Sequence, residues 1–272
     1  MGDEPRFAAD LYQGTAGYYD RYRLPYPAAM TADLVRRAGV GGDGRLLDLA
    51  CGTGQLTFPL RERFSEAWAV DREPDMVAAV RVKAGAAGAG NIRAVAADAE
   101  TLDVPPGHFE LAVIGNAFHR LDRDLVAARL SRWLRPGGCV ALCWSFGPNE
   151  GGEQWQRALA ATLGKWRAAL GAADRVPANW DEPRRVRPDR QVLADAGFGA
   201  SVRQEFAVEH RWTLPELAGF VRSTSVLPPS VLGGQQAAFD ADLAAALRPF
   251  AADGAFPQTV SFAYELARKP GG

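Results

Sequence analysis

Cysteine and histidine are scarce in this sequence. It has three of each among 272 residues. An odd and sparse set of cysteines is not a disulfide framework. Cys139 and Cys143 fall four residues apart in one apolar run, and an extended chain would separate their Cα atoms by roughly 13 Å, too far for a bridge. We therefore expect Cys51, Cys139 and Cys143 to be reduced thiols in the core.

An excess of charge of either sign is also missing. The chain has 31 basic and 32 acidic residues, which gives a formal net charge of -1. Nucleic-acid-binding domains carry a basic stripe, so we expect no nucleic-acid partner. No run reaches the roughly 20 apolar residues of a membrane-spanning helix. Met1–Arg6 lacks the basic start and apolar core of a signal peptide. These absences predict a soluble, cytoplasmic protein that binds no membrane.

Short apolar runs alternate with helical patterns in the first half of the chain. Pro74–Lys83 begins with proline, a favoured first helical residue. Leu121–Leu134 has helical apolar spacing, followed by the breaker Pro136-Gly137-Gly138. The alternation predicts an α/β fold, a parallel sheet with helices on both faces. The expected strands are Arg45–Ala50, Glu66–Asp71, Ile92–Asp98, Phe109–Gly115 and Cys139–Ser145.

The second half is richer in helical patterns. Residues 153–170 place Trp155, Leu159, Leu163, Trp166 and Leu170 on one stripe, which is typical of core packing. After a connection rich in proline and arginine, we expect helices over 189–196, 214–225 and 235–247, a strand over 201–208 and a last strand over 260–266.

A glycine-containing loop follows the first strand and is expected to open a helix. It reads Asp48-Leu49-Ala50-Cys51-Gly52-Thr53-Gly54-Gln55. Gly52 and Gly54 allow a tight turn and a close approach of the backbone to a ligand. The N–H groups at the start of the next helix would face that ligand.

Polar residues at the strand ends indicate which ligand the loop holds. A dinucleotide site requires a third glycine where this chain has Thr57, and Asp48 would repel a pyrophosphate. S-adenosylmethionine (SAM), with its ammonium and sulfonium groups, fits acidic surroundings better. Asp71, 19 residues after Gly52, suits ribose hydroxyls, and Asp98 suits an adenine amine. Helix capping is the simpler alternative for Asp71.

These motifs resemble those of the class I SAM-dependent methyltransferases. Residues 46–55 resemble motif I and residues 69–76 the second motif. Residues 97–100 and 134–138 are similar to the later motifs. Residues 18–27 resemble the N-terminal segment of the UbiE/trans-aconitate-methyltransferase-like, small-molecule subgroup. The resemblance is strong over residues 12–146 and weak beyond.

The resemblance implies a Rossmann-like, doubly wound, seven-stranded sheet whose last strand is antiparallel, with added helices as a cap over the active site. It implies SAM as the cofactor and S-adenosylhomocysteine as its product, with residues 18–23 folded over the cofactor. The expected cofactor-binding residues are Tyr18, Tyr22, Arg23, Asp48, Ala50, Cys51, Gly52, Gly54, Gln55, Asp71, Arg72, Met76, Asp98, Ala99, Glu100 and Asn116.

The segment after the fourth strand, Asn116-Ala117-Phe118-His119, separates this chain from several subfamilies. It lacks the motif of amino-methylating DNA enzymes, and no cysteine follows a proline as cytosine-C5 enzymes require. Metal-dependent catechol enzymes have aspartate at the position of Asn116, so we expect no metal. His119 is the candidate catalytic base, with a role in shaping the pocket as the alternative. The expected acceptor-binding residues are Tyr26, His119, Trp144, His210 and Arg222.

The sequence therefore predicts one class I methyltransferase domain over residues 1–272, a monomer or homodimer. Within it we expect an N-terminal helical lid (1–40), a SAM-binding core (41–150), a helical cap that binds the acceptor (151–255) and the final strand (256–272). The expected function is SAM-dependent O-, N- or C-methylation of a small molecule. Analogy with the small-molecule subgroup suggests a place in secondary metabolism. The alternatives are a SAM-fold protein that does not methylate, such as a cyclase, a nicotinamide-dependent oxidoreductase, and a non-enzymatic binding protein.

Overall fold

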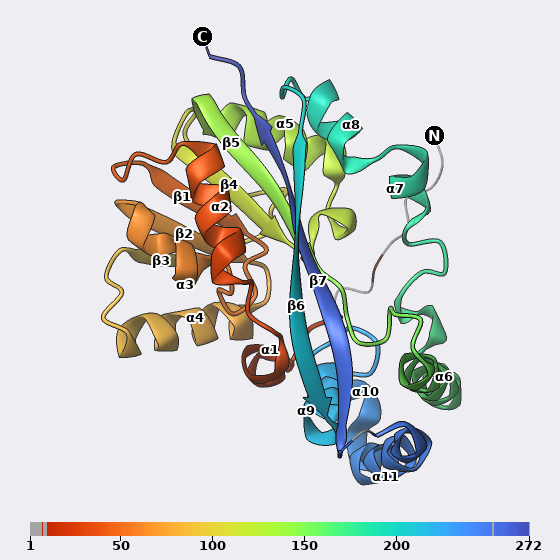
Figure 1. The fold of residues 1–272 in the computed structure, drawn as a ribbon. Helices are drawn as coiled ribbons and strands as arrows, with labels where there is room; N and C mark the ends of the chain where they lie inside the picture. The colour runs from red at the N-terminus through yellow and green to blue at the C-terminus, as the bar shows by residue number, and fades with distance from the viewer. Residues whose placement is uncertain (1–6, 8–9, 252, 272) are drawn as a thin grey trace. The chain divides into compact units, whose positions relative to one another are not determined.

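The computed structural model describes residues 7, 10–251 and 253–271, so Met1–Arg6 lies outside the described residues. Its strands form one seven-stranded sheet in the order β3-β2-β1-β4-β5-β7-β6 (Figure 1). The strands are β1 (Arg45–Leu49), β2 (Glu66–Asp71), β3 (Ile92–Ala96), β4 (Phe109–Gly115), β5 (Leu134–Ser145), β6 (Val202–Thr213) and β7 (Ala255–Arg268).

The described helices number eleven, apart from short 3-10 turns. They are α1 (Ala16–Tyr22), α2 (Ala28–Ala38), α3 (Thr57–Leu60), α4 (Pro74–Ala86), α5 (Arg123–Trp133), α6 (Gln154–Ala169), α7 (Glu182–Val186), α8 (Asp189–Asp195), α9 (Leu214–Arg222), α10 (Pro229–Leu232) and α11 (Gln236–Leu247). In the part of the chain that the structure describes, no helix has the length and apolar character needed to cross a membrane.

Pairing within the sheet confirms the expected fold class. Strands β3, β2, β1, β4 and β5 pair in parallel, and the last strand, β7, runs antiparallel to β5. This is the Rossmann-like, doubly wound arrangement that the alternation of apolar runs and helices predicts.

The chain divides into two compact units, one built on the sheet and one helical. The sheet unit comprises Pro25–Ser145, Asn179–Phe206 and the described residues from Phe262 onward. The helical unit comprises the described residues up to Leu24, Phe146–Ala178 and those of Ala207–Ser261. Residues 25–40 and 179–206, which the sequence assigned to a lid and a cap, thus cluster with the sheet because α2 packs on β5 and α8 on α5.

Side-chain alternation along the strands gives the sheet unit two buried faces. Leu47, Leu49 and Ile114 point to the face that carries Val126 of α5 and Leu193 of α8 in one apolar cluster. On the opposite face, Ala69 packs with Val80 of α4. Because successive residues of a strand point to opposite faces, one strand contributes side chains to both layers.

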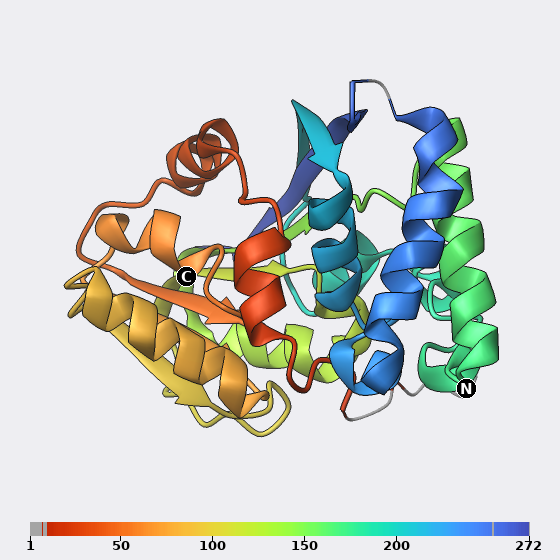
Figure 2. The same ribbon diagram turned by 90° about the horizontal axis from the view of Figure 1, so that it is seen from below.

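The helical unit has a core of its own. Trp155, Leu159 and Leu163 of α6 are buried against Phe239 and Leu243 of α11, which confirms the predicted packing stripe. Figure 2 shows α6 and α11 side by side, in green and blue. Helices α1 and α9 also pack together, and Gly219 permits this because a Cβ there would lie 2.4 Å from the Tyr22 ring.

Several predicted boundaries are wrong. The breaker Pro136-Gly137-Gly138 lies inside β5, which starts at Leu134 and shifts register against β4 between Phe109 and Leu111. A strand irregularity accommodates residues that would end a regular ladder. The strand expected over 201–208 extends to Thr213, so His210 and Trp212 lie on β6. The last strand, β7, begins at Ala255 rather than Val260.

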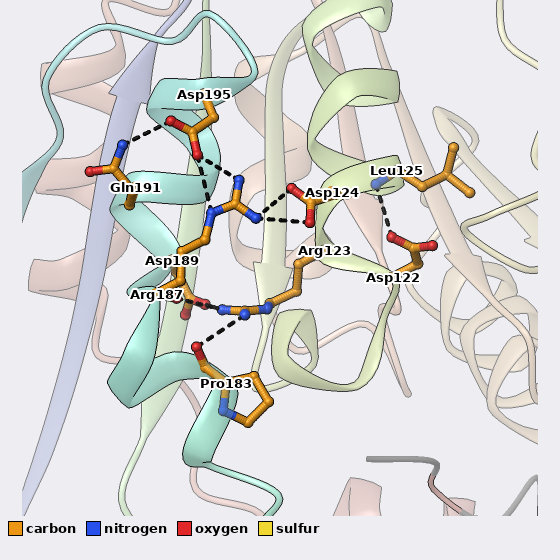
Figure 3. A network of polar contacts seen from close by, with 9 residues as sticks. All are labelled: Asp122, Arg123, Asp124, Leu125, Pro183, Arg187, Asp189, Gln191 and Asp195. Atoms are coloured by element: carbon orange, nitrogen blue, oxygen red, sulfur yellow. Dashed lines mark hydrogen bonds and ion pairs between the residues drawn. The ribbon is translucent and has the colours of Figure 1, made fainter. Parts of the chain in front are cut away.

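A buried ion pair fixes α7 and α8 to the start of α5. The guanidinium of Arg123 donates to Asp189 Oδ1 at 3.1 Å and to the carbonyl oxygens of Arg187 and Pro183 (Figure 3). Its side chain and that of Asp189 are only 7% and 5% exposed. Arg187, by contrast, pairs with Asp124 and Asp195 at the surface.

We expect Arg123→Ala to lower the free energy of unfolding by about 3–5 kcal/mol. The substitution removes one of the two arginines that pair with the buried Asp189 and leaves the carbonyl oxygens of Arg187 and Pro183 without this donor. The matched variant Arg187→Ala removes two exposed ion pairs and should cost far less. Urea unfolding of the two variants measures the difference. Equal losses would show that burial of the Arg123 pair does not matter.

Candidate active site

The carboxyl ends of β2, β1 and β4 bring polar residues to one edge of the sheet. These strands are neighbours and run in parallel, and the strand order reverses between β1 and β4. Asp71 ends β2, Ala50 follows β1 and Asn116 follows β4. Ligands of open α/β sheets bind at such a switch point, so this edge is the candidate active site.

The backbone at this edge is held in left-handed conformations. The φ angles are 55° at Gly52 and 85° at Gly54, which glycine tolerates without strain. Ala50 and Asn116, with φ of 55° and 51°, carry a Cβ and are strained. Strained residues of this kind concentrate at ligand sites.

Asp71 ties the glycine loop to the next strand. Its Oδ2 accepts a hydrogen bond of 2.8 Å from the Gly52 N–H, and its Oδ1 accepts one of 2.9 Å from the Glu73 N–H. Burial raises the pKa of this carboxyl, and the two N–H donors lower it. The simpler alternative of helix capping is not what is found, because the residue at the N-cap of α4 is Glu73 and no side chain caps that helix.

Asp48 lies beneath the loop rather than at its surface. Its side chain is buried, and its Oδ2 accepts a hydrogen bond of 2.5 Å from the Thr57 hydroxyl. Burial raises its pKa to about 7. The helix expected after the loop is only the four-residue α3, starting at Thr57. Asp48 thereby anchors the turn from the loop into α3.

The middle of the loop carries an unsatisfied polar atom. The Thr53 hydroxyl is buried and has no hydrogen-bond partner among the described residues. Buried polar groups are normally paired, so an orphan in a ligand loop indicates a missing partner. A Cβ on Gly54 would lie 2.8 Å from the Phe58 ring, which leaves room only for glycine.

The remaining predicted cofactor residues of the sheet unit follow the ends of β1, β2, β3 and β4 in the chain. Arg72 pairs with Asp98 at 3.5 Å, and both side chains are about half exposed. Glu100 accepts a hydrogen bond from the Asp122 N–H.

Asn116 exchanges hydrogen bonds with Ser145 at the end of β5. Cys51, Met76 and Ala99 are buried, whereas Gln55 is partly exposed.

Tyr26, predicted to bind the acceptor, packs on the end of β4. A Cβ on Gly115 would lie 2.9 Å from the Tyr26 hydroxyl and 3.2 Å from Leu56. The ring of Tyr26 also contacts that of Phe262 edge to face. The Tyr26 hydroxyl therefore lies close to the glycine loop, within the same unit.

His119, the candidate base, follows β4 in the 3-10 turn Phe118–Arg120. Burial and the nearby charges of Arg120, Arg184 and Arg123 hold the pKa of its imidazole well below the usual range. The Nε of Arg120 donates to its Nε2 at 3.2 Å, which requires a neutral ring. Its ring lies 5.1 Å from that of Trp180.

Five predicted site residues belong to the helical unit, and their roles, like those of the sheet-unit residues, stay predictions. Arg23 donates to the Ser223 hydroxyl and stacks on Phe220. Arg222 is buried and pairs with Asp240. The others are Tyr18 and Tyr22, whose rings stack, and His210, whose ring contacts Trp212.

Sequence reasoning missed Thr57, Ser145 and Trp180 as parts of this edge. Thr57 was noted only as the position where a third glycine is lacking. A signal was present, because a carboxylate inside a buried strand requires a nearby donor. The places of Ser145 and Trp180 depend on side-chain packing, which no local pattern reveals.

We expect the stability of the wild type relative to Asp48→Asn to fall as the pH rises from about 4 to about 7. In that range the unfolded carboxyl ionises while the folded one remains protonated, which favours unfolding. The difference is on the order of 4 kcal/mol by the conversion of pKa shifts. Urea unfolding at several pH values measures it, with the exposed Asp103→Asn as control. A constant difference between wild type and Asp48→Asn would contradict the raised pKa.

Comparisons with known proteins agree with this geometry. A family model described as a methyltransferase domain matches residues 46–138. An uncharacterised methyltransferase of Mycobacterium tuberculosis is 30% identical over 154 residues, covering 57% of this chain and 59% of the relative. The chain thus spans less than two thirds of that relative's length.

Two further proteins are similar to this chain. A demethylmenaquinone methyltransferase of Thermus thermophilus is 33% identical over 170 residues, covering 59% of this chain and 76% of the relative. The crystal structure of the YcgJ protein of Bacillus subtilis has a TM-score of 0.54 at 16% identity, covering 89% and 98% of the two chains, which shows a shared fold. With the glycine loop and the strand-end aspartates in place, the chain belongs to the class I SAM-dependent methyltransferases.

Proposed function

We propose that this methyltransferase uses SAM to methylate a small-molecule acceptor on oxygen, nitrogen or carbon. The observation that carries the proposal is the Gly52 loop held by Asp71 at the switch point of the sheet. The name of the Thermus relative gives a small molecule, demethylmenaquinone, as its acceptor.

The residues at the edge fit SAM. Each oxygen of Asp71 accepts one N–H and keeps a lone pair for a ribose hydroxyl. The Thr53 hydroxyl offers an unused donor inside the loop, and the half-exposed Asp98 offers an acceptor for an adenine amine. A nicotinamide dinucleotide fits less well, because Thr57 occupies the position of the third glycine that a dinucleotide loop requires.

When bound, SAM supplies a methyl group already activated by the sulfonium. The protein then contributes alignment, which can lower a barrier by about 7–11 kcal/mol. Asp71 fixes the loop before the cofactor arrives, so little ordering is needed on binding. A proton must leave the acceptor only where the methylated atom carries one.

His119 is the proposed base for such a proton. Its imidazole is neutral, so a lone pair exists, but Arg120 donates to Nε2. The acceptor must therefore displace the Arg120 guanidinium before Nε2 can take its proton. The positive charges of Arg120, Arg184 and Arg123 oppose formation of the imidazolium.

We expect S-adenosylhomocysteine to bind the wild type with micromolar affinity and Asp71→Ala at least tenfold more weakly, about 1.4 kcal/mol. The substitution removes both the ribose acceptor and the partner of the Gly52 N–H. Calorimetric titration measures the affinities, with the exposed Asp103→Ala as the matched control. Lack of binding by folded wild type would refute the proposed cofactor, and a parallel titration with NAD tests the oxidoreductase alternative.

For an acceptor found by product mass, we expect His119→Asn to lower turnover by about 10²–10⁴-fold, the usual contribution of a general base. Affinity for S-adenosylhomocysteine should not change. His108→Asn is the control, because His108 packs between Trp68 and Phe109 away from the loop. Near-normal turnover of His119→Asn would limit His119 to shaping the pocket. A product without an added methyl group would support the cyclase alternative instead.

A further inference from the structure

A cleft of about 380 Å³ opens in the sheet unit between the end of β5 and the segment that carries α7 and α8. This volume is within the range of small-molecule sites. None of the residues assigned above to the cofactor lines it. The lining residues are Trp144, Trp180, Asp181, Arg184, Arg185, Pro188, Asp189, Arg190, Arg203 and Glu265.

Two indole rings contribute flat walls to this cleft. Trp180 is 36% exposed, which is unusual for so large an apolar side chain. Trp144 is partly exposed, and the guanidinium of Arg203 lies 4.8 Å from the centre of its ring. Aromatic faces of this kind bind planar ligands at little cost in side-chain entropy.

Arginine supplies all four positive charges of the cleft. Three of these side chains have carboxylate partners: Arg184 pairs with Asp189, Arg185 with Asp181 and Arg203 with Glu205. In the part of the chain that the structure describes, Arg190 has no ion pair and is exposed. Its guanidinium is therefore available to a ligand.

The carboxylates of the cleft are already engaged. Asp181 and Asp189 hold arginines, and Glu265 accepts a hydrogen bond from the Ser201 hydroxyl. With four arginines and three carboxylates, the lining keeps one net positive charge. Guanidinium groups match carboxylate and phosphate oxygens with two parallel hydrogen bonds.

The wall formed by α7 and α8 is fixed rather than loose. Arg123 at the start of α5 binds Asp189 and the carbonyl oxygens of Pro183 and Arg187, as Figure 3 shows. The same Asp189 also receives the Arg184 side chain at 2.8 Å. The arginines of the cleft are thus presented by a backbone that is already ordered.

The cleft adjoins His119. Trp180, one wall of the cleft, lies 5.1 Å from the His119 ring. Arg184, another lining residue, is among the charges that lower the pKa of His119. Trp180 thus lies between the lining of the cleft and the ring of the proposed base.

We propose that this cleft binds the carboxylate or phosphate of a planar acceptor, so the substrate class is a small aromatic or conjugated acid. The ring would lie against Trp144 and Trp180, and the anionic group would bind Arg190 and the neighbouring arginines. This inference rests on the proposed methyltransferase function, because it assigns the acceptor of the same site.

The test compares acids with neutral amides of the same shape. Benzoate and 1-naphthoate are titrated against benzamide and 1-naphthamide, calorimetrically, into protein saturated with S-adenosylhomocysteine. We expect at least one acid to bind tenfold or more tightly than its amide. Arg190→Ala should weaken that acid at least fivefold and leave the amide unchanged. Trp180→Ala should weaken both, because it removes a wall that either ring uses.

The control is Arg63→Ala, because Arg63 is an exposed arginine of the sheet unit outside the cleft. It should change neither affinity. Acids that bind no better than amides, or a preference for acids that survives Arg190→Ala, would overturn the inference. Failure of S-adenosylhomocysteine to bind would refute the cofactor proposal instead, and the titrations with acids can be repeated without it.

Discussion

The paired hydrogen bonds of the Asp71 carboxylate are the constraint on which the rest of the site depends. One carboxylate accepts from Gly52 in the loop after β1 and from Glu73 at the start of α4. It thus joins two parallel strands and a helix at the point where a ligand approaches. Burial would otherwise disfavour the charged carboxylate, and the two N–H donors offset part of that cost. The loop is consequently shaped before any ligand binds.

A second buried carboxylate supports the first from below. Asp48 accepts a hydrogen bond from the Thr57 hydroxyl. The nearby negative charge of Asp71 contributes to the raised pKa of Asp48. A protonated Asp48 removes this repulsion and leaves Asp71 as the charged group of the pair. The loop therefore combines a neutral anchor beneath the backbone with a buried carboxylate, Asp71, that two N–H donors hold in place and that suits a ligand with positive and hydroxyl groups.

Strong local patterns predicted most of the sheet unit. The apolar runs and Pro74 placed β1, β2, β4 and α4 within a few residues, because burial on both sides leaves continuous apolar stretches. Local patterns failed where pairing overrides propensity. Pro136 lies inside β5 because an irregular register with β4 accommodates it. The helix expected after the loop is only the four-residue α3, which starts at Thr57.

By itself the sequence determined the fold class, the glycine loop and the residues at the strand ends. These follow from periodicity, from the conformational freedom of Gly52 and Gly54, and from the shared edge of parallel strands. Only the tertiary structure decided that the buried Asp48 accepts a hydrogen bond from Thr57 and that Arg120 donates one to His119. It also decided that Trp144, Trp180 and Arg190 line one cleft. Such contacts join residues far apart in the chain, and their geometry depends on packing that no local pattern encodes.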